Sequence, residues 1–177
     1  WYSERGLRKE NTEKNKIPEE NLDHTFLKVD SKEDVPFRAI DEDPLLREIG
    51  NTSLIPHPEN EQIVCKNERQ NPTLSHKDRL GVGMILGLRP KGLLEEGQRV
   101  VEASSGNTAG AVAFAANRLG HPCTIVVRET ASPVKIGFVN ALGAEVIKTP
   151  DVGHEHDYYY QKVAKKHAKE HDAVFLN

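Results

Sequence analysis

Cysteine, methionine and aromatic residues are scarce in this chain of 177 residues. It contains two cysteines, one methionine and one tryptophan, and aromatic residues make up 6% of it. Small secreted domains use many more cysteines, so this scarcity argues against a disulfide-stabilised scaffold and favours a reduced, cytoplasmic protein. Cys65 and Cys123 are far apart and lie in apolar stretches, so we expect both thiols in the core.

Long apolar runs and an excess of positive charge are also absent. No stretch approaches the roughly 18 apolar residues that a membrane helix needs. The 24 Lys and Arg residues are outnumbered by 27 Asp and Glu residues, which gives a formal net charge of -3. Because such a chain lacks a broad cationic field, we expect neither nucleic acid nor a membrane as its partner. The chain begins at Trp1 without a basic-then-apolar segment, which we interpret as an incomplete N-terminus rather than a signal peptide.

The composition divides the chain into two parts. Hydrophobic residues make up 37% of it, enough for the core of one domain, whereas the mean hydropathy of -0.60 requires a polar remainder. Residues 1–34 mix acidic and basic residues with scattered apolar ones, so we predict a disordered charged arm there. We predict that residues 35–177 form the folded part.

Beyond residue 62, short apolar runs alternate with helical patterns. The patterns predict strands at 63–65, 99–103, 123–127, 145–148 and 173–176, and helices at 44–49, 80–88, 108–119, 133–142 and 158–169. In the second helix, Leu80, Met84 and Leu88 recur at i, i+4 and i+8, the spacing of one helix face. The alternation predicts an α/β fold with three αβα layers and a mostly parallel sheet, and such sheets bind ligands at the carboxyl ends of their strands.

The most informative loop lies between a predicted strand and an alanine-rich helix. It consists of Ser104, Ser105, Gly106, Asn107 and Thr108. Hydroxyl groups, an amide and a glycine at the positive end of a helix dipole are suited to binding a carboxylate or phosphate. The simpler alternative is an ordinary N-cap, but one serine or asparagine would suffice for that.

A second loop, residues 71–79, contains a lysine in an unusual place. Ser75 and Asp78 have the spacing of a capping box, which would put Lys77 in the first turn of the helix that follows. The helix dipole repels a cation there and so favours the neutral amine that Schiff-base chemistry requires. On position alone, however, the better interpretation of Lys77 is one of many surface lysines.

Two further features are interpreted as structural. In residues 128–133 we predict an ordinary turn, with Ser132 as N-cap and Pro133 at the first helical position. The histidines at 154 and 156, and those at 167 and 171, have spacings that a metal site could use. No cysteine is near and lysines crowd the second pair, so we expect no metal site.

Taken together, the loops resemble the cysteine synthase and cystathionine β-synthase family. The resemblance rests on Ile-Gly-Asn-Thr at 49–52, Lys-Asn-Glu at 66–68, Asn-Pro-Thr at 71–73, Ser-His-Lys-Asp-Arg at 75–79, Ser-Gly-Asn-Thr at 105–108 and Leu-Gly-Ala-Glu at 142–145. It covers roughly residues 45–177 and implies the fold of the fold-type II pyridoxal-phosphate enzymes, which include the tryptophan synthase β subunit.

The resemblance also implies roles for individual residues. Lys77 would form the Schiff base with pyridoxal 5'-phosphate and then act as the proton-transferring base, and Asn107 would bind the 3'-hydroxyl of the cofactor. The substrate carboxylate would be held by the loop as a whole, that is by Ser104, Ser105, Gly106, Asn107 and Thr108. The implied reaction is β-replacement on O-acetylserine or a similar serine derivative by sulfide, which gives cysteine. A cytoplasmic enzyme that is a homodimer when full length is implied as well.

Two alternatives stay open at this stage. One is cystathionine β-synthase activity on serine and homocysteine. The resemblance implies that the vertebrate-type haem site of that enzyme needs a cysteine ahead of the core. Since no cysteine precedes Cys65, we expect no haem. The other is a truncated, non-catalytic homologue that acts as an interaction module. The second is motivated by the glycine-rich phosphate loop of the family, which lies beyond the point where this chain stops. We therefore expect the N-terminal part of the enzyme, with the C-terminal half missing and the chain alone incomplete for catalysis.

The sequence also departs from the family at several positions. Leu74 stands where glycine is usual, and His76 stands where a small apolar residue is usual, directly beside the lysine. Leucine has less freedom in φ than glycine and adds bulk near the cofactor ring. Ala109 replaces a usual glycine and Arg128 a usual proline. These departures predict reduced efficiency without the loss of a catalytic group.

Overall fold

The computed structural model describes residue 40 and residues 42–176, all within a unit that spans Glu33–Asn177. The arm predicted over residues 1–34 lies outside the described residues. Along the chain, the elements are α2 (Pro44–Arg47), β1 (Leu54–His57), β2 (Asn60–Lys66), the 3-10 helix η3 (Glu68–Gln70), α3 (Lys77–Leu88), β3 (Val100–Ala103), α4 (Asn107–Arg118), β4 (Cys123–Arg128), α5 (Pro133–Ala141), β5 (Glu145–Thr149), α6 (Tyr160–Glu170) and β6 (Val174–Phe175).

Beyond residue 98 the predicted strands and helices agree with the structure to within two residues at each end. Local signals explain this agreement. α4 and α5 are followed by Gly120 and Gly143, whose φ values of 78° and 87° end each helix in a conformation that glycine adopts at no steric cost. At the other end of α5, Ser132 is the N-cap residue and Pro133 the first helical residue, as predicted.

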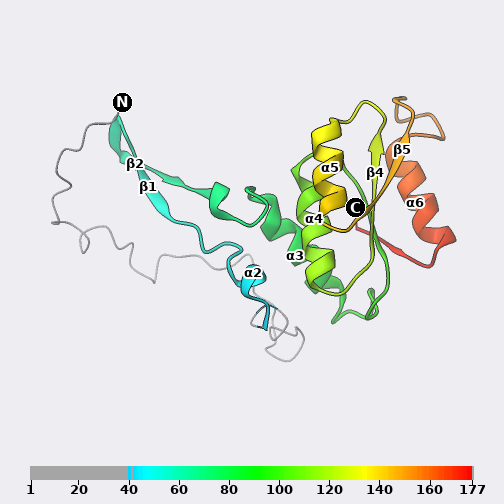
Figure 1. Ribbon diagram of the computed structural model, residues 1–177, viewed down its shortest axis with the longest axis horizontal. Helices are drawn as coiled ribbons and strands as arrows, with labels where there is room; N and C mark the ends of the chain where they lie inside the picture. Colours follow the sequence, from blue (N-terminus) through cyan, green and yellow to red (C-terminus); the bar gives the residue numbers. More distant parts are fainter. Residues whose placement is uncertain (1–39, 41, 177) are drawn as a thin grey trace. The chain divides into compact units, whose positions relative to one another are not determined.

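Four strands form a parallel sheet in the order β5-β4-β3-β6. On one face, apolar side chains of β3 and β4 such as Val100 and Ile125 pack in one cluster with residues of α3, α4 and α5. On the other face, Val101 and Val126 pack with Ala164 of α6. The strands therefore lie between two helical layers (Figure 1), and the predicted three-layer αβα arrangement is confirmed.

The strand predicted at 63–65 exists, but it does not belong to the parallel sheet. It is part of β2, which pairs antiparallel with β1 in a separate two-stranded sheet. Ile55 and Cys65 face each other across this hairpin, and both are exposed. The prediction that both cysteines are buried is therefore wrong for Cys65, whereas Cys123 is buried; neither forms a disulfide.

The predicted helix at 80–88 is α3, and the spacing of Leu80, Met84 and Leu88 describes its buried face only in part: Met84 and Leu88 are partly buried against the core. The buried residues include Gly81, Val82 and Ile85, whereas Leu80 is 42% exposed. The reason is a close approach between two helices. A Cβ atom built on Gly81 would lie 2.6 Å from the backbone oxygen of Ala111 in α4, so only glycine permits this contact. The closest contact of α3 with α4 is thus made by its smallest residue, which the leucine spacing does not indicate.

Two contacts show that α3 and α4 run parallel and in step. Gly81 lies against Ala111, and eight residues further along both helices the Arg89 guanidinium donates to the backbone oxygen of Leu119. Four residues before the first contact, both helices begin, at Lys77 and Asn107. The two helix N-termini therefore lie at the same end of this pair.

Candidate active site

Lys77 is the first residue of α3, as predicted, and its side chain is partly buried. Its backbone N–H donates to Ser75 Oγ at 3.2 Å, and the N-cap residue, His76, makes no side-chain capping bond. The capping box predicted from Ser75 and Asp78 is only half present. Asp78 does not reach back to Ser75 but binds Thr73 instead.

Asp78 ties the turn before Lys77 to the start of α3. It is fully buried, and its carboxylate accepts a hydrogen bond from the Thr73 N–H at 2.7 Å and another from the Thr73 hydroxyl. Burial raises the pKa of the Asp78 carboxyl, while the bonds from Thr73 favour its anion. The Asp78 side chain therefore holds the two ends of the turn over residues 73–78 together, directly beside Lys77 in the sequence.

The loop predicted to bind an anion, residues 104–108, connects β3 to α4, and we call it the ligand loop. Ser104, Ser105 and Thr108 are partly buried, and Gly106 and Asn107 are exposed. Within the described residues no side chain caps α4; its N-cap residue is Gly106, whose N–H donates to Ser104 Oγ at 3.2 Å. The simpler alternative, an ordinary side-chain N-cap, is therefore not what the loop forms.

The fold brings Lys77 and this loop to one place. Each stands at the start of a helix, and α3 and α4 begin side by side because they run parallel and in step. The positive ends of two helix dipoles point to the same region, at the carboxyl end of β3. An amine, hydroxyl groups and backbone N–H groups are thus collected where an anionic ligand is favoured.

A small pocket lies next to the loop, between α4 and α5. It is lined by Ser104, Ser105 and Gly106 and by mostly apolar side chains such as Val139. Lys135 of α5 also lines it, and the sequence patterns gave no reason to single out this residue. The pocket also borders β4 and β5, so it lies where the loop meets the sheet and α5.

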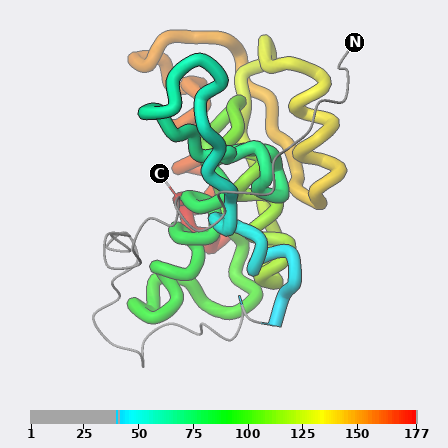
Figure 2. Tube along the Cα trace, turned by 90° about the vertical axis from the view of Figure 1, so that its left-hand side faces the viewer, coloured from blue at the N-terminus to red at the C-terminus, as the bar shows by residue number. Residues whose placement is uncertain are grey.

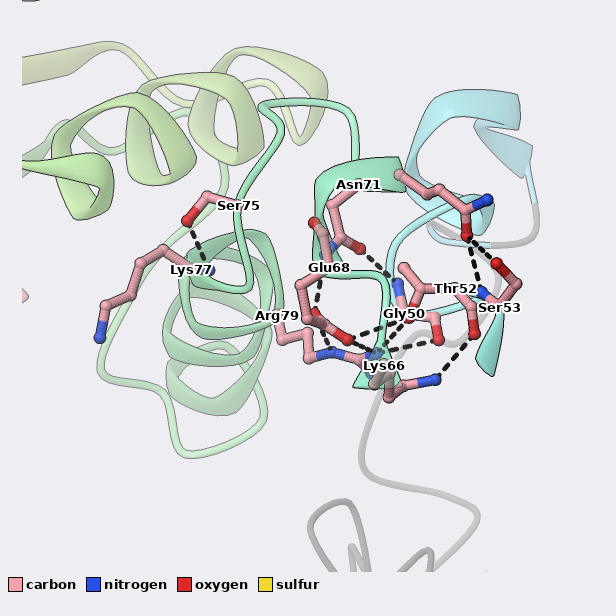
Figure 3. Close-up of polar contacts among 10 residues, drawn as sticks. Gly50, Thr52, Ser53, Lys66, Glu68, Asn71, Ser75, Lys77 and Arg79 are labelled. Atoms are coloured by element: carbon pink, nitrogen blue, oxygen red, sulfur yellow. Dashed lines mark hydrogen bonds and ion pairs between the residues drawn. The ribbon is translucent and has the colours of Figure 1, made fainter. Parts of the chain in front are cut away.

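Five residues of the motifs, none of them predicted to have a role, form one hydrogen-bonded cluster in the structure. We call Gly50, Thr52, Glu68, Asn71 and Arg79 the clasp (Figure 3). Arg79 donates to both carboxylate oxygens of Glu68, at 3.0 and 2.8 Å, and to the backbone oxygen of Gly50 at 3.0 Å. The segment around Gly50 therefore passes beside the start of α3, as the cyan and green stretches in Figure 2 show.

The clasp fully occupies the Glu68 carboxylate. Besides Arg79, the Thr52 hydroxyl donates to one oxygen and the Asn71 amide to the other, both at 2.9 Å. The hydrogen bonds from Arg79 are the largest cause of a Glu68 pKa lowered to about 2. Glu68 and Arg79 are opposite charges eleven residues apart that flank the Asn-Pro-Thr motif, a sequence signal that could have indicated this contact but was not used.

Leu74 adopts a backbone conformation that is unusual for its residue type. Its φ is 61°, and its side chain is 65% exposed. The left-handed region brings Cβ close to the following carbonyl oxygen, which costs about 1–2 kcal/mol for a residue other than glycine. The structure therefore gives a physical reason why glycine is favoured three residues before Lys77.

Replacing Leu74 with glycine is expected to raise the free energy of unfolding by about 0.5–1 kcal/mol. Relief of the left-handed strain outweighs the greater entropy that glycine gives to the unfolded chain. Leu74→Ala is the control, because alanine keeps Cβ and the strain while it removes the exposed isobutyl group. Urea unfolding of the three proteins measures the difference. Equal gains for glycine and alanine would show that φ is not the cause.

Two further findings concern metals and membranes. Among residues 40 and 42–176, no group of three His, Cys, Asp or Glu side chains is placed to hold a metal ion. Across the same residues, none of the helices has the length and apolar character required to cross a membrane.

Comparison with known proteins identifies the class to which this fold and site belong. A family model described as pyridoxal-phosphate dependent enzyme matches residues 45–177, so the chain belongs to that family. Its cofactor is pyridoxal 5'-phosphate.

Individual relatives give a closer comparison. The chain is 35% identical to cysteine synthase 1 of Emericella nidulans over 139 residues, which cover 75% of this chain and 38% of that protein. It is 42% identical to cystathionine beta-synthase of Apis mellifera over 113 residues, which cover 60% of this chain and 22% of that protein. Among solved structures, that of O-ureido-L-serine synthase matches with a TM-score of 0.67 and 28% identity over 75% of this chain and 42% of that one. The chain thus spans well under half the length of these relatives.

Proposed function

We propose that this chain carries the Schiff-base lysine and the substrate-carboxylate loop of an enzyme that performs β-replacement on a serine derivative. The reaction closest to the sequence motifs is that of a cysteine synthase, with O-acetylserine or a similar compound as the amino-acid substrate and sulfide as the nucleophile. The observation that supports this most directly is the common end of α3 and α4, where Lys77 and Asn107 begin adjacent helices.

The residues present fit the cofactor in chemical type. Lys77 offers a primary amine at a helix start, partly buried and with no acidic partner within hydrogen-bond distance in the described part of the chain. Asn107 is exposed at the start of α4 and can donate or accept at the 3'-hydroxyl. When bound, pyridoxal phosphate supplies an electron sink for bonds at the α carbon of the substrate.

The chain's own groups would then do three things. The Lys77 amine would hold the cofactor by an imine bond, with loss of water; once the amino group of the substrate has displaced it from that bond, the freed amine would accept and return a proton. The backbone N–H groups at the start of α4, with Ser104, Ser105 and Thr108, would bind the substrate carboxylate. That carboxylate would be oriented by the α4 dipole, which fixes the amino acid relative to Lys77.

Lys77 is expected to be the main site of modification when the chain is incubated with pyridoxal phosphate and the imine is reduced with borohydride. Peptide mapping by mass spectrometry measures the fraction labelled at each lysine. Lys77→Arg should abolish most of the labelling, because a guanidinium forms no such imine. Lys135→Arg is the matched control, since it removes a lysine that lines the neighbouring pocket and should leave Lys77 labelled.

The result that would overturn the proposal is labelling spread evenly over many lysines, or labelling that Lys77→Arg leaves unchanged. That outcome would favour the alternative of a non-catalytic module. Cystathionine β-synthase activity is a second candidate because of the 42% identity to the Apis mellifera protein. Turnover assays of the full-length protein with O-acetylserine and sulfide, and with serine and homocysteine, separate the two reactions.

A further inference from the structure

The clasp lies next to Lys77 in sequence but does not contact its amine. Lys77 and Arg79 are two residues apart on α3, which places their side chains about 200° apart around the helix axis. Figure 3 shows the Lys77 side chain leaving the helix on the side away from the clasp. Any influence of the clasp on Lys77 must therefore pass through the backbone of the first turn.

Two of the three residues in this first turn are fixed to other segments. Asp78 is bound to Thr73 in the preceding turn. Arg79 is bound to Glu68 and to the backbone of Gly50. Since these two residues point in different directions around the axis, their bonds determine both the position and the rotation of the helix start. Of the three side chains in this turn, only that of Lys77 makes no hydrogen bond within the described residues.

The clasp is also built for geometry more than for net stability. Its ion pair is partly solvent-exposed, and exposed pairs contribute little to stability. The contact is nevertheless bidentate and shared with Gly50, whose φ of 85° and missing Cβ admit the guanidinium; a Cβ atom there would lie 2.5 Å from Arg79 Nη1. A planar two-point contact specifies orientation in a way that a point charge does not.

From these contacts we infer that Glu68 and Arg79 are positioning residues for Lys77, which orient the start of α3 so that the amine meets the ligand loop. The inference rests on the proposed role of Lys77 as the Schiff-base lysine. It assigns a function to Glu68 and Arg79, which lie outside the candidate active site. Neither residue is a catalytic residue, because neither touches the reacting atoms.

The test compares the rate at which Lys77 is labelled by pyridoxal phosphate and borohydride in the wild type, Glu68→Gln, Arg79→Gln and the double variant. Each single change is expected to slow labelling of Lys77 by about tenfold, because a small misplacement of a reacting group has a large effect on its rate. The double variant should be no slower than either single one, since both remove the same contact. Labelling of other lysines should not change.

Two controls test whether the slower labelling comes from misplacement of Lys77, from the loss of a charge, or from the loss of any surface ion pair. Arg79→Lys keeps the charge but not the planar fork, so it is expected to restore little of the Lys77 rate, whereas a purely electrostatic role predicts full rescue. Arg99→Gln breaks a comparable pair with Glu145, which lies at the start of β5, and should leave the Lys77 rate unchanged. A urea transition for each variant establishes that it is folded.

Hydrogen exchange provides a readout that does not depend on the cofactor. In Glu68→Gln, the amides over residues 73–79 are expected to exchange faster, while those of β3 and β4 keep their wild-type rates. Unchanged labelling of Lys77 in folded Glu68→Gln and Arg79→Gln would overturn the inference. If Lys77 is not labelled even in the wild type, the proposed function fails as well, and the two failures are therefore distinguished.

Discussion

Replacing Gly81 with alanine is expected to lower the free energy of unfolding by about 2–3 kcal/mol, because the new methyl group would overlap the backbone of α4. Its Cβ would lie 2.6 Å from the Ala111 oxygen and 3.1 Å from the Val112 nitrogen. Backbone atoms in the middle of a helix cannot move aside as a flexible side chain can. The helices must instead separate, which also disturbs the common end where Lys77 and Asn107 begin.

Gly83, on the same helix, provides the matched control. A Cβ atom there would meet no heavy atom within 4 Å. Gly83→Ala is therefore expected to raise the free energy of unfolding by about 0.5–1 kcal/mol, the usual gain when alanine replaces glycine inside a helix. Urea unfolding measures both variants, and they should change stability in opposite directions. Similar midpoints for the two would mean that α3 and α4 are not in close contact at Gly81.

Replacing Asp78 with alanine is expected to cost about 2–3 kcal/mol of unfolding free energy, since two hydrogen bonds to a charged, fully buried acceptor are lost. The Thr73 N–H loses its acceptor, and the turn before Lys77 opens. Asp78→Asn is the control with nearly the same shape. Its amide can accept from the Thr73 N–H and donate to the Thr73 hydroxyl, so its stability should stay within about 1 kcal/mol of the wild type.

The raised pKa of Asp78 predicts how the stability difference between Asp78→Asn and the wild type changes with pH. Because the carboxyl titrates at a higher pH in the folded state, the folded chain holds more protons than the unfolded chain in the window just above pH 3.8. The contribution of Asp78 to stability therefore falls as the pH rises through this window. Asp78→Asn lacks this term, so its stability relative to the wild type should increase from acidic to neutral pH. An unchanged difference across the window would contradict the pKa shift.

Much of the candidate site was evident before the structure. Lys77 was predicted at a helix start from the Ser-x-x-Asp spacing, and it is the first residue of α3. The ligand loop was predicted between a strand and a helix, and it connects β3 to α4. These features depend on local signals, namely caps, glycines after helices and short apolar runs, which act over a few residues and can be interpreted one segment at a time.

Other features depended on contacts between distant segments. The hairpin of β1 and β2 was missed because β1 contains Pro56 and has no clear alternation, so the strand at 63–65 was assigned to the parallel sheet. The clasp joins Gly50 to Arg79, which are 29 residues apart in the sequence, and no local pattern reveals a contact over that separation. The spacing of apolar residues along the chain does not indicate which backbone carbonyl a guanidinium will contact.

The sequence by itself determined the alternation of strands and helices, the positions at which most of them end, and the motifs that resemble a pyridoxal-phosphate family. Only the tertiary structure decided which face of α3 is buried. The leucine spacing marked a face on which Met84 and Leu88 are partly buried, but the closest contact with α4 is made by Gly81, where a Cβ would overlap the Ala111 backbone, and Leu80 is exposed. That close approach sets the register of the two helices, and in this register Lys77 and the ligand loop stand at the same end of the pair.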